Sequence, residues 1–331
     1  MQEIYLNNNE LISIGDWRKK IADLYTNKEL KESETAILGK IIILIECAIK
    51  KRTDYLNIIN NNKKKYTKKS INKKIMEETT NNSLGIFFSG GLDSSLIAAI
   101  CKKNNLKFTC YTVGFQDGNM NIPEDVKHAQ NVASFLGLTD KEFKIKIFNL
   151  REAEKIIIQT AKILSKIPKK ENINNIVNLG VGSVISAAYS ISNNENFFFS
   201  GLGSEELFAG YERHKKNPSN DECFNGLINM YERDLLRDYT ISQYYNFKFL
   251  TPFLDEELIK YALRIPIKMK INDNNNKIIL RKAAYIYLKE FSERPKKAAQ
   301  YGSSFDKAIA KLALKNGFKT KNDYYESIIK Q

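Results

Sequence analysis

The feature that most constrains the fold of this chain is the stretch GIFFSGGLDSSLIAAI, residues 85–100. Apolar residues typical of a buried strand run directly into Ser89, two glycines and Asp93, and an apolar helical pattern follows. Glycines let a backbone approach a phosphate closely, and the amides at a helix N-terminus attract anions. A phosphate would repel Asp93 unless a cation lay between them, so this loop predicts a bound phosphate group together with Mg²⁺.

Strand and helix patterns alternate from residue 84 onward. The predicted strands cover residues 85–88, 108–115, 142–147 and 197–199, and the predicted helices cover 94–103, 124–136, 150–167 and 176–190. Such alternation predicts an α/β fold with a doubly wound parallel sheet, whose ligands bind beyond the carboxyl ends of the strands. Strand signals are few after residue 217, so a helical C-terminal subdomain is expected.

The chain before the glycine loop differs in its sequence pattern, which is mostly helical. We interpret residues 1–82 as a helical N-terminal segment and residues 83–331 as the domain that contains the glycine loop. A helix is predicted over residues 36–51, with Ser33 near its N-cap. The lysine- and asparagine-rich stretch 60–82 is interpreted as a surface insertion with one short helix.

Composition limits the class of protein. The net charge of +14 has two interpretations: the lysine and asparagine runs are solvated loops, or they form a surface for RNA or another polyanion. The four cysteines lie far apart without a Cys-x-x-Cys pair, which argues against a zinc site or a disulfide framework. No apolar run is long enough to span a bilayer and no signal peptide is visible, so a cytoplasmic protein without a membrane partner is expected.

Several motifs carry a family resemblance. Ser-Gly-Gly-x-Asp-Ser at residues 89–94 resembles the loop of the ATP-pyrophosphatase (PP-loop) superfamily, and FFSGLGSEELFAGY at 198–211 resembles the signature of the asparagine synthetases. Further matches follow in the order of that family, and two are shared with its stand-alone asparagine-synthetase-domain proteins. The matching segments are PFLD at 252–255, KIILR at 277–281 and RPK at 294–296, with RDLLRD at 233–238 and KKAAQYGS at 296–303 shared with the stand-alone proteins.

This resemblance, which covers residues 84 to about 310, implies an ATP-dependent carbon–nitrogen ligase similar to the AMP-forming asparagine synthases. Such an enzyme adenylates a carboxylate or an amide of a small-molecule substrate, releases pyrophosphate, and passes the activated group to ammonia or an amine. The positions that match the family's ATP-binding residues, including those around the adenine, are Phe88, Ser89, Gly90, Gly91, Leu92, Asp93, Ser94, Ser95, Val113, Ser200 and Gly201.

The resemblance also implies catalytic roles. Asp93 and Glu205 would hold Mg²⁺, with Glu205 standing where the family usually has Asp. Lys296 would offset the charge that develops at the α-phosphate, although without its flanking motif it would read as a surface lysine. For Asp255 and Arg281 a functional role and a structural one, as helix cap and ion pair, stay open.

The chain departs from the family pattern on the acceptor side. Leu202 replaces the carboxylate between the two glycines of the second signature, and Lys248-Phe249-Leu250 replaces the Glu-x-Arg before PFLD. A pocket made by Leu202, Phe249 and Leu250 offers no carboxylate to an ammonium group, so free aspartate is not the expected acceptor. Gln2 follows Met1 where the full-length synthetases carry a glutaminase cysteine, so ammonia or a separate amidase partner is the expected nitrogen source.

Two other functions remain open on the sequence. One is an RNA- or tRNA-modifying enzyme of the same superfamily, which the basic charge favours. The other is a non-catalytic nucleotide-binding protein that keeps the synthetase fold. The intact loop at residues 89–94 speaks against the second, because a decayed site has no reason to keep Asp93.

Overall fold

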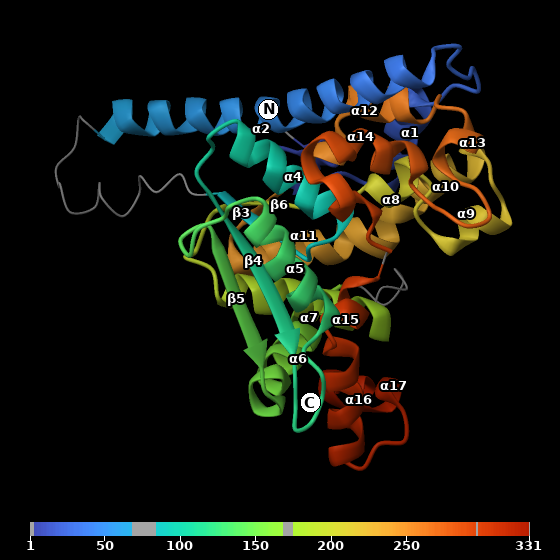
Figure 1. The fold of residues 1–331 in the computed structure, drawn as a ribbon. Coiled ribbons are helices and arrows are strands. Elements are labelled where there is room, and N and C mark those ends of the chain that lie inside the picture. Colours follow the sequence, from blue (N-terminus) through green and yellow to red (C-terminus); the bar gives the residue numbers. More distant parts are fainter. Residues whose placement is uncertain (1–2, 68–83, 168–174, 296, 331) are drawn as a thin grey trace.

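The computed structural model describes residues 3–67, 84–167, 175–295 and 297–330. Its centre is a five-stranded parallel sheet in the order β5–β4–β3–β6–β7 (Figure 1). The α/β class predicted from the sequence is therefore confirmed. The strands of this sheet are β3 (Leu84–Phe87), β4 (Phe108–Phe115), β5 (Phe143–Phe148), β6 (Phe197–Phe199) and β7 (Lys248–Leu250).

The apolar content of each strand follows its place in the sheet. Every residue of β4 is buried, and β3 and β6 are nearly so, because helices cover both faces of these strands. The strand β5 lies at the edge, where Lys144 is exposed and Lys146 is partly exposed. Charged side chains of this kind discourage an edge strand from pairing with another chain.

Helices make up most of the remaining structure. The N-terminal part forms a small hairpin, β1 (Leu6–Asn7) with β2 (Glu10–Leu11), followed by two helices, α1 (Ile14–Leu24) and α2 (Glu34–Thr67). The helices that follow the strands of the sheet are α4 (Leu92–Lys103), α5 (Glu124–Phe135), α6 (Leu150–Leu164), α7 (Ile176–Ser190) and α8 (Ser204–Leu207). The C-terminal half contains α9 (Glu212–Lys216), α10 (Asn220–Met230), the π-helical turn η2 (Tyr231–Leu235), α11 (Leu236–Tyr245), the 3₁₀ turn η3 (Pro252–Leu254), α12 (Glu256–Ala262), α13 (Ile267–Lys270), α14 (Ile278–Leu288), η4 (Lys289–Glu293), α15 (Ala299–Gly302), α16 (Phe305–Lys315) and α17 (Lys321–Ile329).

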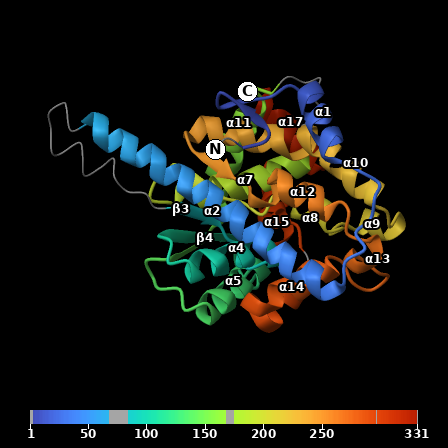
Figure 2. The ribbon, with the colours of Figure 1, turned by 90° about the horizontal axis from the view of Figure 1, so that it is seen from above.

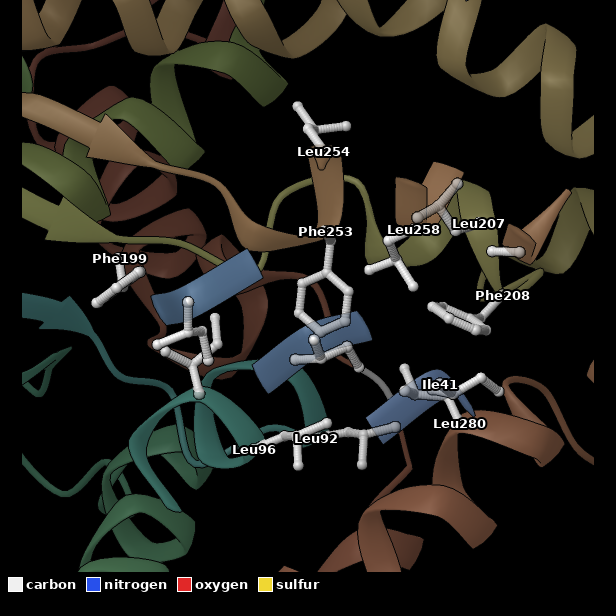
Figure 3. Packing of buried hydrophobic residues seen from close by; sticks show 14 of the residues in the cluster. Ile41, Leu92, Leu96, Phe199, Leu207, Phe208, Phe253, Leu254, Leu258 and Leu280 are labelled. Atoms are coloured by element: carbon white, nitrogen blue, oxygen red, sulfur yellow. The ribbon is translucent and has the colours of Figure 1, made fainter. Parts of the chain in front are cut away.

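Two hydrophobic clusters hold these layers together. The larger one joins α2, α4, α12 and α14, and Figure 3 shows Ile41, Leu96, Phe253 and Leu280 pointing toward one another within it. The second cluster packs α6, α7, α16 and α17 against the sheet residues Tyr111, Val113 and Phe198. Since Ile41 belongs to the N-terminal segment and Leu280 to the C-terminal half, the first cluster joins these two parts of the chain.

Two elements differ from the prediction. The helix predicted over 36–51 continues to Thr67 as part of α2, so residues 60–67 belong to this long helix rather than to a separate short one. Residues 68–82 of that stretch lie outside the described residues. Figure 2 shows the far end of α2 running past the body of the molecule. The strand β7 was also missed, because three residues without alternation give no strand signal.

The order of the strands sets the position of the site. Since β3 pairs in parallel with β6, the loops that follow these two strands emerge side by side at the same edge of the sheet. These are the first glycine loop, residues 89–91, and the second glycine loop, residues 200–203. Among the described residues, no helix has both the length and the apolar composition that a membrane span requires.

Candidate active site

The first glycine loop is shaped by close backbone packing. Gly90 has a φ of +65°, and a Cβ there would lie 2.5 Å from the backbone nitrogen of Ala129. The backbone amide of Gly91 donates to Oγ of Ser89 at 3.3 Å, and Oγ of Ser94 donates to the carbonyl of Gly91 at 3.3 Å. These contacts tie the loop to the first turn of α4, whose free amides are suited to bind an anion.

The second glycine loop approaches the first one closely. A Cβ on Gly201 would lie 2.7 Å from Cβ of Asp93, so only glycine fits there. Oγ of Ser204, at the start of α8, donates to Oδ1 of Asp93 at 2.6 Å. The two loops are therefore joined directly through the Asp93 side chain.

A buried lysine bridges the two predicted metal ligands. Nζ of Lys277 lies 2.7 Å from Oδ2 of Asp93, 2.6 Å from Oε1 of Glu205 and 3.1 Å from Oγ of Ser204. Burial disfavours the charge on Lys277, but Asp93 and Glu205 outweigh it and raise the pKa of its ammonium group. The sequence placed Lys277 in a family motif without giving it a role, because a contact across 184 residues leaves no local signal.

This arrangement fits a divalent cation. The carboxylates of Asp93 and Glu205 converge on one positive charge, the ammonium of Lys277, so they lie close enough to share a cation. Mg²⁺ is commonly held by one or two carboxylates together with substrate phosphates, and these two would be the protein's contribution. Among the described residues no group of three or more metal-ligating side chains forms, so phosphate oxygens and water would complete the coordination.

A C-terminal arginine fixes the first glycine loop. Nη1 of Arg294 donates to the carbonyl of Ser89 at 2.7 Å, and Nη2 donates to Oδ1 of Asp125 at 2.6 Å. Burial raises the pKa of Asp125 to about 6, although Arg294 opposes that rise. Nη1 of Arg281 in turn donates to the carbonyls of Ser292 and Arg294, at 2.8 and 2.9 Å.

These residues surround one cavity of about 280 Å³. Of the predicted site residues, those that line it are Phe88, Ser89, Gly91, Leu92, Asp93, Ser94, Val113, Ser200, Gly201 and Glu205. Gly90 and Ser95 do not line the cavity: Gly90 makes the turn, and Ser95 is fully buried in α4. Lys296 lies outside the described residues, although its neighbours Pro295 and Lys297 both line the cavity.

The cavity has an apolar middle. Val113 on β4 faces a wall made by the α7 residues Val181, Val184, Ile185 and Ala188. Such a wall suits the flat faces of a nucleotide base. The sequence left open whether Asp255 and Arg281 have a functional or a structural role. Arg281 lines the cavity, whereas Asp255 caps α12 and pairs with Lys51 at 3.0 Å.

Four further residues that line the cavity, Leu202, Phe249, Arg237 and Asp238, form what we call its acceptor end. Leu202 and Phe249 were expected there, but Leu250 and Lys248 do not line this cavity, and Nζ of Lys248 donates to Asn9 at 2.7 Å. No carboxylate was expected at this end, yet Asp238 contributes one. The sequence contained it in the segment RDLLRD, but nothing in that pattern indicated which charge would face the site.

The comparisons with known proteins agree on one family. The sequence matches the family model described as asparagine synthase over residues 69–246 and 221–322. A Methanocaldococcus jannaschii protein assigned by name to the glutamine-hydrolysing asparagine synthetases is 30% identical over 282 residues, which is 72% of this chain and 49% of that protein.

Two further relatives come from eukaryotes. A glutamine-hydrolysing asparagine synthetase of Gallus gallus is 30% identical over 256 residues, covering 73% of this chain and 42% of its own. An asparagine synthetase domain-containing protein of Saccharomyces cerevisiae is 40% identical over 111 residues, 32% of this chain and 20% of its own. The chain thus spans about half or less of the curated relatives it matches.

Proposed function

Because the chain belongs to the asparagine synthase family, we propose that it is an ATP-dependent carbon–nitrogen ligase. It adenylates a carboxylate or an amide of a small-molecule acceptor, releases pyrophosphate, and transfers the activated group to ammonia or an amine. The observation that carries this proposal is the convergence of Asp93, Ser204, Glu205 and Lys277 beside the first glycine loop. That convergence provides a cation site next to a set of free amides, as phosphoryl chemistry requires.

The residues of the phosphate end have distinct roles in this proposal. The amides of the first glycine loop and of the α4 N-terminus bind the terminal phosphates, and the hydroxyls of Ser89 and Ser94 add further hydrogen bonds. The carboxylates of Asp93 and Glu205 would hold Mg²⁺, which would supply positive charge to the phosphates. Lys277 keeps these two carboxylates together and balances their charge.

The reacting phosphate lies at the middle of the cavity in this account. The apolar wall of α7 and Val113 hold the base, so the α-phosphate falls between the base and the first glycine loop. Lys296 follows Pro295 and precedes Lys297, which both line the cavity, and this placement supports its role in offsetting charge at the α-phosphate. Arg294 is a positioning residue, because it holds the Ser89 carbonyl rather than the nucleotide.

The test is exchange of labelled pyrophosphate into ATP, measured over a panel of amino acids, other carboxylic acids and total tRNA. We expect exchange that requires Mg²⁺ and one class of acceptor, and no exchange in the variant Asp93→Asn. A small acid as the active acceptor supports the ligase, and tRNA as the active acceptor would favour the RNA-modifying alternative. Exchange with none of them, by a folded protein that binds ATP, would contradict the proposal.

A further inference from the structure

Asp238 is a buried carboxylate at the acceptor end of the cavity. It lies in the first turn of α11 and is 5% exposed. Nε and Nη2 of Arg237 both lie 2.7 Å from its Oδ1. Among the described residues, none donates a hydrogen bond to Oδ2 of Asp238. Some side-chain oxygens and nitrogens of these residues lack a partner because they are fully enclosed, but Oδ2 of Asp238 is not one of those enclosed atoms. Oδ2 is therefore accessible from the space that Asp238 lines.

That space has two parts, and Asp238 lies where they meet. Besides the main cavity, Asp238 lines a smaller one of about 20 Å³, and Leu202 and Phe249 also line both. A volume of this size holds about one molecule as small as water or ammonia. The far side of the small cavity is formed by the N-terminal hairpin, through Leu6 and Asn9. A small nitrogen compound fits there, with Oδ2 as the polar atom able to receive its hydrogen.

Transfer of a nitrogen compound at the acceptor end requires an atom that can accept a proton. Leu202 stands where the family carries a carboxylate, and neither Leu202 nor Phe249 can take a proton from an attacking nitrogen. Arg237 cannot either, because a guanidinium stays protonated and this one also donates to Asp234 and Asn178, at 3.2 Å each. Asp238 is the one group among these four wall residues that can accept a proton.

We propose that Asp238 is the catalytic residue that binds the nitrogen nucleophile, ammonia or a small primary amine, and accepts its proton. The inference rests on the proposed ligase function. The nitrogen lone pair forms the new C–N bond to the adenylated carbon, and the C–O bond to the AMP phosphate breaks, with its electron pair leaving on AMP. The surplus proton on nitrogen passes to Oδ2 of Asp238, so that the step yields amide, AMP and a protonated carboxyl group.

The surroundings of Asp238 are consistent with that role. Burial raises the pKa of Asp238 to about 6, with Arg237 opposing the rise and Asp234 adding to it. A carboxylate of this kind is ionised at neutral pH yet a better proton acceptor than an ordinary aspartate. Arg237 also fixes the direction of the carboxylate, since both of its contacts fall on Oδ1.

The test separates the two half-reactions in Asp238→Asn, which keeps the shape of the side chain but accepts no proton. With an acceptor found by the exchange screen, we expect pyrophosphate exchange to change less than about threefold. Amide formation from ammonium chloride should fall by about 100-fold or more, the usual contribution of a general base. The matched control is Asp234→Asn, which removes a carboxylate from the same Arg237 but not from the cavity wall.

The outcomes distinguish the inference from the proposed function. If Asp238→Asn and Asp234→Asn lose amide formation equally, the effect is assigned to Arg237 and the inference is overturned. The inference is also overturned if Asp238→Asn has the same ratio of amide formation to pyrophosphate exchange as wild type. If wild type shows no exchange, the proposed function fails and the proton-transfer step fails with it. Binding of the nitrogen compound at Asp238 is then tested on its own by carboxyl NMR of aspartate-labelled wild type titrated with ammonium chloride. A saturable shift of the Asp238 signal supports that binding, and no shift up to molar ammonium overturns it.

Discussion

The two ends of the active-site cavity are built differently. At the phosphate end, Asp93 and Glu205 share a buried lysine and a serine hydroxyl, and the motifs keep the order of the family. At the acceptor end, Leu202 stands where the family pattern has a carboxylate, Phe249 adds a second apolar side chain, and the charge comes from the Arg237–Asp238 pair. The phosphate end keeps the sequence pattern of the family, and the acceptor end departs from it.

The architecture explains how one end can change without the other. The phosphate end is formed by loops that follow the adjacent strands β3 and β6, and Gly201 packs against Asp93 too closely to admit any side chain. A substitution there disturbs both loops at once. The acceptor end is formed by Arg237 and Asp238 on α11, by Phe249 on the sheet-edge strand β7 and by Leu202 in the second glycine loop. From this difference we infer that the phosphate end constrains the backbone, whereas the acceptor end depends on a few side chains.

The largest expected effect comes from the phosphate end. Asp93→Asn should reduce pyrophosphate exchange by about 1,000-fold or more, because an amide cannot hold the cation that binds the phosphates. The melting temperature should stay nearly unchanged, since Glu205 still pairs with Lys277. Exchange assays and thermal melting measure both effects, with Asp117→Asn at the surface as control. Equal affinity for Mg-ATP in the variant and wild type would rule out the metal role.

Removing the bridging lysine tests the same end through stability. Lys277→Met leaves the carboxylates of Asp93 and Glu205 facing each other without a cation, which should cost about 3–5 kcal/mol of unfolding free energy. Mg²⁺ should restore part of that loss and stabilise the variant more than wild type. The control Lys311→Met breaks a half-exposed pair and should cost less than about 1 kcal/mol. A loss that Mg²⁺ leaves unchanged would argue against a cation site between these carboxylates.

A smaller effect should appear in the pH dependence of Asp125. Its pKa is about 6 in the folded protein and near 4 in an unfolded chain, so folding favours the protonated form. The stability it contributes is present below pH 4 and is lost as pH rises through 6. Relative to Asp125→Asn, wild type should therefore lose about 1–3 kcal/mol of unfolding free energy between pH 4 and 7. Urea unfolding across this pH range measures the difference in unfolding free energy between wild type and Asp125→Asn. The prediction is refuted if this difference changes with pH no more than the difference between wild type and the control Asp117→Asn.

Much of the phosphate end could be predicted because its determinants are local. The strand, the two glycines, Asp93 and the helix follow one another within sixteen residues, and the whole sequence GIFFSGGLDSSLIAAI is informative on its own. The strand β4 and the helix α7 were also predicted with their observed bounds, since both are mainly apolar over their whole length and carry no charged residue. For the same reason the parallel sheet could be inferred before any contact was known.

The rest depended on contacts between distant residues. Lys277 meets Asp93 across 184 residues, and Arg294 meets Ser89 across 205, so no spacing rule could pair them. Asp238 lies in a cluster of two arginines and two aspartates, and only the packing of α11 decides which carboxylate lines the cavity. The length of α2 was missed because lysine and asparagine runs resemble loops, although lysine is a good helix former.

The measurement that tests the central claim most directly is the incubation of the protein with Mg-ATP, aspartate and ammonium, followed by quantification of asparagine and AMP. We infer that the nucleotide end of the cavity is retained and the acceptor end rebuilt. We therefore expect that ATP binds while little or no asparagine forms. Asparagine that appears in step with AMP, at about one per second or faster, would contradict it.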